Sequence, residues 1–129
     1  MKLLLDTHIW LWSLAEPKQL SARVLQELRN PANELWVSPI STWEALLLHA
    51  KGRIRLAGEL RDWVMEATSH MREAPLTHEV VLAAQGLPLE HQDPADRFLA
   101  ASAEVFGLTL VTADVRLLGL GKIGTLANR

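Results

Sequence analysis

The sequence contains no cysteine, which excludes disulfide bonds and metal sites built from thiolate ligands. It also lacks any apolar run near the roughly 18 residues that a membrane-spanning helix needs. The first apolar run, at residues 3–5, is too short for the core of a signal peptide. No internal repeat, low-complexity stretch or linker divides the chain. We therefore expect a cytoplasmic protein without a membrane span, formed by a single domain over residues 1–129.

A strong excess of charge is also lacking, since 13 Lys and Arg residues and 15 Asp and Glu residues leave a net charge of -2. This balance argues against a general nucleic-acid coat protein. It does not exclude an enzyme that acts on nucleic acid, because bound metal ions can offset an acidic cleft and basic residues can line its rim. The candidate rim residues are Lys51, Arg53, Arg55, Arg97, Arg116 and Lys122. For any one of them alone, a solvated surface charge is the simpler interpretation.

Short apolar runs alternate with helical patterns, which favours an α/β fold with a mainly parallel sheet. Strands are predicted at residues 2–5, 35–38, 75–77, 108–112 and 124–126. Helices are predicted to begin at the caps Thr7, Ser21, Ser41 and Asp93, and others at 60–71, around 80–84 and at 115–118. Gly52 is the expected stop of the helix that begins near Ser41.

Two of these predicted helices carry apolar side chains nearly all round, at residues 9–12 and 45–48. A helix without a polar face is either deeply buried or covered by a partner. Full burial of both helices is hard to arrange in a domain of this size. Ordinary core packing explains most of these side chains, and a dimer or a bound partner would account for the excess.

Acidic residues follow two of the predicted strands and lie near the start of two predicted helices. Asp6 comes directly after the first strand, and Asp114 follows the strand at 108–112. Glu44 and Asp96 belong to the helices that begin near Ser41 and Asp93. Each acid also has a structural explanation, because carboxylates cap helices, close a capping box and favour the positive end of the helix dipole.

Taken together, the four acids predict a cation site. The carboxyl ends of strands in a parallel sheet meet at one edge, where ligands bind. Two unit charges about 4 Å apart repel by roughly 4 kcal/mol at an effective dielectric constant near 20. Such a cluster needs a counter-ion, and ligands that are all oxygen select hard cations such as Mg²⁺ or Mn²⁺. Mg²⁺ held by carboxylates suits phosphoryl chemistry.

Four segments, at residues 3–8, 37–44, 91–103 and 110–114, also resemble a known family in their order and spacing. The sequence is similar to the PIN-domain ribonucleases, and specifically to the VapC-type toxins of bacterial type II toxin–antitoxin pairs. The resemblance covers essentially the whole chain. It implies a PIN-like three-layer α/β/α sandwich around a mainly parallel sheet of four to five strands. It also implies Mg²⁺-dependent hydrolysis of RNA phosphodiester bonds.

The resemblance assigns roles by motif. Asp6, Glu44, Asp96 and Asp114 correspond to the family's catalytic acidic quartet. Asp6 and Asp96 are the expected principal ligands of Mg²⁺, for which Mn²⁺ could substitute, and Asp114 is a further ligand, directly or through water. Glu44 is expected to orient the attacking water or a second metal ion. The supporting residues are Thr112, Asp93 and Arg97.

The resemblance also implies partners: an RNA substrate, a cognate VapB-like antitoxin that docks a short amphipathic segment on the apolar helices, and a homodimer. The predicted RNA-binding residues are Lys51, Arg53, Arg97 and Arg116. One departure concerns Leu48, because relatives often carry a lysine at about that position. The neighbouring basic residues at 51 and 53 would then supply the positive charge slightly later in the chain.

Two histidines, His8 and His91, lie close to the proposed acids, which suggests a metal ligand or a base. Their spacing does not match a zinc motif, and local packing or hydrogen bonding is the favoured interpretation of His8.

Other protein classes also place an acid after the first strand. A phosphatase of the haloacid dehalogenase type needs a second Asp two positions after Asp6, where His8 stands. A phosphorylated receiver domain needs an acidic pair at its first strand and a lysine after its last main strand, and neither is present in the sequence. Both of these classes are therefore disfavoured. The remaining alternative is a PIN-like module that binds a partner without cutting RNA, against which the intact quartet argues.

Overall fold

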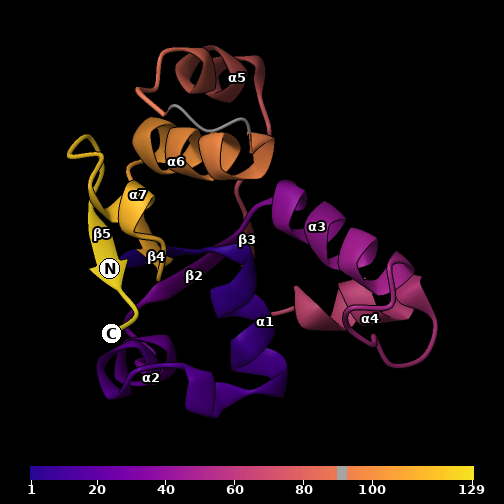
Figure 1. Cartoon of the computed structure of the whole chain (residues 1–129). Helices are drawn as coiled ribbons and strands as arrows, with labels where there is room; N and C mark the ends of the chain where they lie inside the picture. The colour runs from indigo at the N-terminus through magenta and orange to yellow at the C-terminus, as the bar shows by residue number, and fades with distance from the viewer. Residues whose placement is uncertain (90–92) are drawn as a thin grey trace.

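Residues 1–89 and 93–129, which this computed structural model describes, form a five-stranded parallel sheet with helices on both faces (Figure 1). The strands are β1 (Lys2–Leu5), β2 (Glu34–Val37), β3 (Arg72–Glu73), β4 (Thr109–Thr112) and β5 (Thr125–Ala127). They lie in the order β3-β2-β1-β4-β5. The predicted α/β/α sandwich with a parallel sheet is therefore confirmed.

The helices within residues 1–89 and 93–129 connect the strands. They are α1 (Thr7–Ala15), the 3-10 helix η1 (Pro17–Gln19), α2 (Ala22–Arg29), α3 (Pro39–Ala50), α4 (Leu60–Ala67), α5 (His78–Gln85), α6 (Pro94–Phe106) and α7 (Val115–Leu118). Figure 1 shows α3 and α4 projecting to one side of the sheet, while α5 and α6 stack above it. Within residues 1–89 and 93–129, no helix combines the length and the apolar character needed to cross a membrane.

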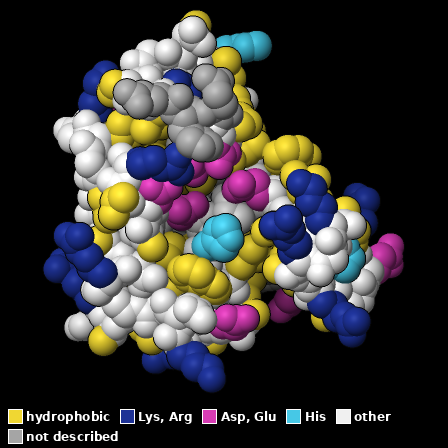
Figure 2. Space-filling view, viewed as in Figure 1, with side chains coloured by type: hydrophobic (Ala, Val, Ile, Leu, Met, Phe, Trp, Pro, Cys, Tyr) yellow, Lys and Arg dark blue, Asp and Glu magenta, His cyan; other side chains and the backbone are white. Residues whose placement is uncertain are grey.

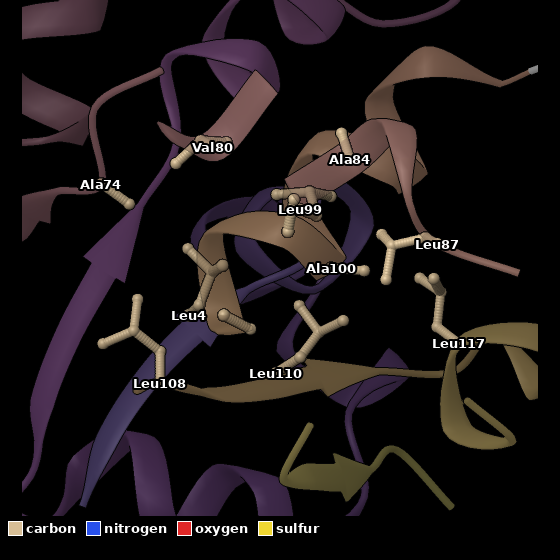
Figure 3. Packing of buried hydrophobic residues seen from close by; sticks show 12 residues of the cluster. Leu4, Ala74, Val80, Ala84, Leu87, Leu99, Ala100, Leu108, Leu110 and Leu117 are labelled. Carbon is tan, nitrogen blue, oxygen red and sulfur yellow. The ribbon is translucent and has the colours of Figure 1, made fainter. Parts of the chain in front are cut away.

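The central strand β1 is buried on both faces. Because side chains alternate along a strand, Leu3 and Leu5 pack into one core and Leu4 packs into the other. Figure 3 shows Leu4 and Leu110 of the sheet facing Leu99 of α6 in the second core. The first core instead takes in residues of α1, α2 and α3. A continuous apolar run such as 3–5 is what a strand covered on both faces requires.

The connections after β1, β2 and β4 lie at the same edge of the sheet. The chain passes through Asp6 into α1, through Ser38 into α3, and through Asp114 into α7. Since β2 and β4 lie on opposite sides of β1, the strand order reverses there, which is where parallel sheets open a crevice for ligands. The backbone N–H of Asp6 donates to the carbonyl oxygen of Val111 at 3.0 Å and ties this edge together.

The start of α3 differs from the prediction. The cap is Ser38, whose hydroxyl accepts from the Ile40 backbone N–H at 3.1 Å, and Pro39 is the first helical residue. The fixed φ of proline suits that position, so the helix begins before Ser41. A capping box from Ser41 to Glu44, the structural alternative for Glu44, is therefore excluded, and both residues lie inside the helix.

Three further boundaries also differ. Asp6 caps α1 in place of Thr7, which confirms the capping role that was the structural alternative for this acid. The strand predicted at 75–77 is absent from the described chain, because β3 lies at Arg72–Glu73 and the Thr77 hydroxyl accepts from the Val80 backbone N–H at 3.2 Å to cap α5. Helix α4 ends at Ala67 instead of reaching residue 71. Side-chain caps decide the first two boundaries, because they satisfy N–H groups that the first turn of a helix leaves unpaired.

Candidate active site

A cleft lies at the carboxyl edge of the sheet, between α1, α3 and the start of α6. It encloses about 480 Å³ and is lined by Asp6, His8, Ile9, Trp12, Glu44, Asp93, Asp96, Ala113, Asp114 and Arg116. Figure 2 shows acidic side chains gathered in this hollow, with a histidine and hydrophobic side chains beside them. The four acids predicted from the sequence thus line one cleft, although they come from separate elements.

Both carboxylate oxygens of Asp6 are held by the surrounding chain. Its Oδ1 accepts from the Thr7 backbone N–H at 2.7 Å, and its Oδ2 accepts from the Thr112 hydroxyl at 2.6 Å. The Thr112 Oγ1 in turn accepts from the Asp114 backbone N–H at 3.0 Å. Because each carboxylate oxygen has a second lone pair, Asp6 is positioned by the protein and can still bind a ligand.

Glu44 is held by Thr7, for which the sequence predicts the role of a helix cap. The Thr7 hydroxyl donates to a carboxylate oxygen of Glu44, and the hydroxyls of Thr7 and Ser41 lie 2.9 Å apart. Thr7 and Ser41 are buried, with exposed fractions of 1% and 0%. Ser41 and Glu44 are three residues apart on α3 and so share the helix face that contacts α1.

Arg116 lies between two of the acids. Its Nη2 is 2.9 Å from Asp96 Oδ2 and 2.7 Å from Asp114 Oδ2, and its Nε is 3.2 Å from Asp114 Oδ1. Arg116 is predicted from the sequence as a rim residue that contacts RNA. In the structure, its guanidinium is the positive charge that bridges Asp96 and Asp114 within the cleft.

The pKa values of the acids show how crowded the negative charge is. Burial raises the pKa of Asp6 and of Glu44 above their ordinary values. Burial, followed by repulsion from neighbouring carboxylates, raises the pKa of Asp96 to about 7. Hydrogen bonds from Arg116 lower the pKa of Asp114. The cleft therefore favours neutralisation of its carboxylates, either by protons or by a cation.

The family resemblance implies Mg²⁺, which these residues fit by their donor chemistry and not by their present arrangement. Among residues 1–89 and 93–129, no three His, Asp or Glu side chains are arranged to hold a metal ion as they stand. The donor chemistry fits a hard cation, because the acids offer only oxygen and their raised pKa values reflect uncompensated charge. Arg116 contacts Asp96 and Asp114 through the oxygens that would be ligands. Because Mg²⁺ and the Arg116 guanidinium would share these carboxylates, repulsion between the two cations would favour release of at least one of the Arg116 contacts.

Asp93 and Arg97 flank Asp96 but differ in position. Asp93 lines the cleft and caps α6, where its Oδ1 accepts from the Ala95 backbone N–H at 3.0 Å. Arg97 is absent from the described lining of the cleft, and its guanidinium lies among backbone carbonyls. It donates to the carbonyl oxygens of Ala84 at 2.9 Å, Leu87 at 3.3 Å and Leu89. Arg97 thus fastens the chain after α5 to α6.

The remaining predicted residues lie around the cleft. Arg53 and Arg55 line a pocket beside it, while Lys51 and Lys122 are exposed. His8 is exposed on the cleft wall, and its ring centroid is 5.7 Å from that of Trp12. His91 lies outside the described residues.

A family model described as PIN domain matches residues 3–123. The chain belongs to the PIN domain family. Among curated proteins, Ribonuclease VapC22 of Mycobacterium tuberculosis is 39% identical over 115 residues, which cover 88% of each chain. The resemblance inferred from the four sequence segments is therefore confirmed.

Solved structures of similar proteins share the PIN-like fold. The chain matches a structure of VapBC2 from Rickettsia felis bound to a promoter DNA fragment, with a TM-score of 0.72, 16% identity and coverage of 98% of each chain. It also matches a toxin–antitoxin complex from Klebsiella pneumoniae, with a TM-score of 0.67, 18% identity and coverage of 98% of this chain and 97% of that one. At such low identity, these matches establish the fold alone.

Proposed function

We propose that this PIN-domain chain is the VapC-type toxin of a type II toxin–antitoxin pair and hydrolyses RNA as a Mg²⁺-dependent endoribonuclease. The observation that carries the proposal is the cleft lined by Asp6, Glu44, Asp96 and Asp114. The 39% identity to a protein named as a ribonuclease supports it. The proposal includes a single domain over residues 1–129 and a cytoplasmic location.

Asp6, Asp96 and Asp114 are the proposed ligands of Mg²⁺, or of Mn²⁺ in its place. A bound Mg²⁺ would supply Lewis-acid chemistry, since it lowers the pKa of water and offsets charge on the phosphate. Asp6 needs little rearrangement for this role, because Thr112 and the start of α1 already hold its carboxylate. Once released from the acids, the guanidinium of Arg116 is free to contact a phosphate at the rim.

Glu44 is the proposed group that orients the water for in-line attack on phosphorus. Its carboxylate receives the Thr7 hydrogen bond, which holds the side chain toward the cleft. Its raised pKa makes it a better proton acceptor than an ordinary surface glutamate. As the water oxygen bonds to phosphorus, one of its protons passes to Glu44. The leaving RNA oxygen takes the electron pair of its broken bond to phosphorus and then a proton from solvent.

RNA cleavage should stop in EDTA and return when Mg²⁺ or Mn²⁺ is added in excess. The measurement is gel analysis of end-labelled RNA incubated with the purified protein, followed by sequencing of the cut ends to identify the substrate class. Cleavage that is equally fast in EDTA would contradict the metal dependence. A protein that cuts no RNA with either metal would instead be a partner-binding PIN-like module.

A VapB-like antitoxin is the proposed protein partner, and the fold offers a groove for its amphipathic segment. The groove encloses about 440 Å³ between α1, α2 and α4, and its apolar lining includes Leu14, Leu25, Leu28 and Trp63. The groove is lined in part by α1, one of the two helices that we expect a partner to cover. On α3, the other such helix, the apolar side chains at 46–48 are partly exposed. A homodimer is also proposed, supported by Trp43 of α3, which is 52% exposed.

Leu14→Asp should weaken binding of a VapB-like antitoxin by about tenfold or more, because it places a charge in the apolar groove. Leu14 is 50% exposed, so the fold should tolerate the change. Calorimetric titration measures the affinity. The matched control is Leu82→Asp, since Leu82 of α5 is 74% exposed and lies outside the groove. Equal affinities for both variants would reject this groove. The accompanying tryptophan fluorescence change should come from Trp63, because Trp10 is only 1% exposed before binding.

A further inference from the structure

A second pocket adjoins the active-site cleft. It encloses about 510 Å³ and lies between α1, the end of α3 and the segment 53–57. His8 and Trp12 belong to the walls of both the cleft and this pocket, so the two hollows share a border. The volume is within the roughly 300–1,000 Å³ that small-ligand sites occupy.

The lining of this pocket combines an apolar floor with a basic mouth. Leu11, Leu48 and Leu56 contribute the floor, and the indole of Trp12 is half-buried against it. The mouth carries three exposed charged residues, which are Arg53, Arg55 and Glu16. An aromatic ring beside two arginines is the chemistry that binds an unstacked base and its phosphates.

The segment that carries the two arginines is fixed in place by the end of α3. Gly52, with φ of 72°, allows a left-handed turn in which the Gly52 N–H donates to His49 O at 3.0 Å and the Arg53 N–H to Leu48 O at 2.9 Å. The His49 Nδ1 then accepts from the Leu56 backbone N–H at 3.2 Å, and Leu56 is only 7% exposed. The pocket wall is therefore preformed.

We infer that this pocket binds one unstacked base of the RNA next to the scissile phosphate, with Trp12 stacking on the base and Arg53 and Arg55 contacting the flanking phosphates. The inference rests on the proposed ribonuclease function and adds its base-recognition site. The pocket borders the cleft through His8 and Trp12 and the apolar groove through Leu14 and Trp63. RNA is favoured over a peptide as the occupant because the two arginines at the mouth of the pocket match the charge of the phosphates that would flank the cleft.

The test uses a single-stranded RNA oligonucleotide with one cleavage site and a series in which each base near the cut is replaced, in turn, by an abasic residue. For the wild-type protein with Mg²⁺, one abasic position should raise KM by about tenfold, with a smaller change in kcat. Trp12→Ala should raise KM for the intact RNA by a similar factor and should be insensitive to the abasic residue at that position. Trp12→Phe should restore most of the affinity and the sensitivity.

The arginines are tested through salt. Arg53→Gln should raise KM and reduce the slope of log KM against log salt concentration by roughly 0.7, the value for one lost contact with single-stranded RNA. Arg23→Gln, an exposed arginine on α2, is the matched control and should leave KM and the slope unchanged. Melting temperatures of all variants show whether each is folded.

The outcomes separate the two proposals. A wild-type protein that cleaves no RNA overturns the ribonuclease function itself. A wild-type protein that cleaves RNA while Trp12→Ala keeps the full abasic effect overturns the base site alone. A Trp12→Ala variant that loses affinity for the antitoxin but not for RNA assigns the pocket to a peptide and also overturns it.

Discussion

Replacing Asp96 by Asn should lower the rate of RNA cleavage by about 100-fold or more while the protein stays folded. Asparagine keeps the size of the side chain and removes the charge that a divalent cation needs. Asp6→Asn should have an effect of similar size, because Asp6 is the other principal ligand that we propose. The measurement is the single-turnover cleavage rate at saturating Mg²⁺, which separates the chemical step from product release.

The same Asp96→Asn substitution should raise the melting temperature in EDTA at pH 8. In the folded protein, burial and the neighbouring carboxylates raise the pKa of Asp96 to about 7, whereas its ordinary value is 3.8. Ionised Asp96 therefore destabilises the fold above pH 7, and this effect fades as the pH falls from 7 toward 3.8. Wild-type protein in EDTA should accordingly become more stable between pH 8 and pH 5, and the variant should gain less.

Glu104→Gln is the matched control for Asp96→Asn, because Glu104 lies on the same helix α6 but is exposed. It should change neither the cleavage rate nor the stability. A loss of cleavage in Asp96→Asn together with a lower melting temperature in EDTA would mean that the carboxylate supports the fold, and the metal-ligand role would then lose its support.

The convergence of the acids could be predicted because all strands of a parallel sheet run the same way, so their carboxyl ends lie at one edge. An apolar run buried on both faces, such as 3–5 or 110–111, marks a central strand, and the acid after it must lie at the carboxyl edge. This reasoning placed Asp6 and Asp114 from the residues alone. Glu44 and Asp96 were joined to the site as a group with these two acids, since a position near a helix start is, taken singly, equally consistent with a capping role. The family resemblance then assigned each of them a role.

The contacts that hold the site could not be predicted in the same way. Thr7 reaches Ser41 and Glu44 across 34 and 37 residues, and helical periodicity does not show which helix faces which. The start of α3 could have been predicted, because a Ser-Pro pair is a common helix start. The prediction instead ended a strand at Ser38 and began the helix near Ser41. Local capping signals compete at neighbouring positions, and tertiary packing decides between them.

Basic residues were the least predictable part of the site. Arg97 and Arg116 were both expected to contact RNA, since a basic side chain near an acidic motif suggests a rim. In the structure Arg97 donates to backbone carbonyls and Arg116 bridges two carboxylates, while a contact of either residue with RNA stays a prediction. A sequence shows the charge of an arginine but not which acceptors its guanidinium donates to.

Arg97→Met should lower the free energy of unfolding by about 2–4 kcal/mol. The guanidinium donates to the carbonyl oxygens of Ala84, Leu87 and Leu89, and methionine leaves these acceptors without their donor. Urea unfolding followed by circular dichroism measures the change, and an unaltered m-value would show that the loss lies in the folded state.

Arg97→Lys decides between this structural role and the RNA contact expected from the sequence. Lysine keeps the positive charge but lacks the planar guanidinium that donates to several carbonyl oxygens at once. Arg97→Lys should therefore recover only a small part of the free energy of unfolding that Arg97→Met loses. If Arg97 served RNA instead, Arg97→Lys would bind RNA nearly normally, and Arg97→Met would raise KM at an unchanged free energy of unfolding. For Arg97→Met we expect the free energy of unfolding to fall. Because Arg97 directly follows the proposed ligand Asp96, the cleavage rate should fall as well, since the start of α6 becomes less well ordered.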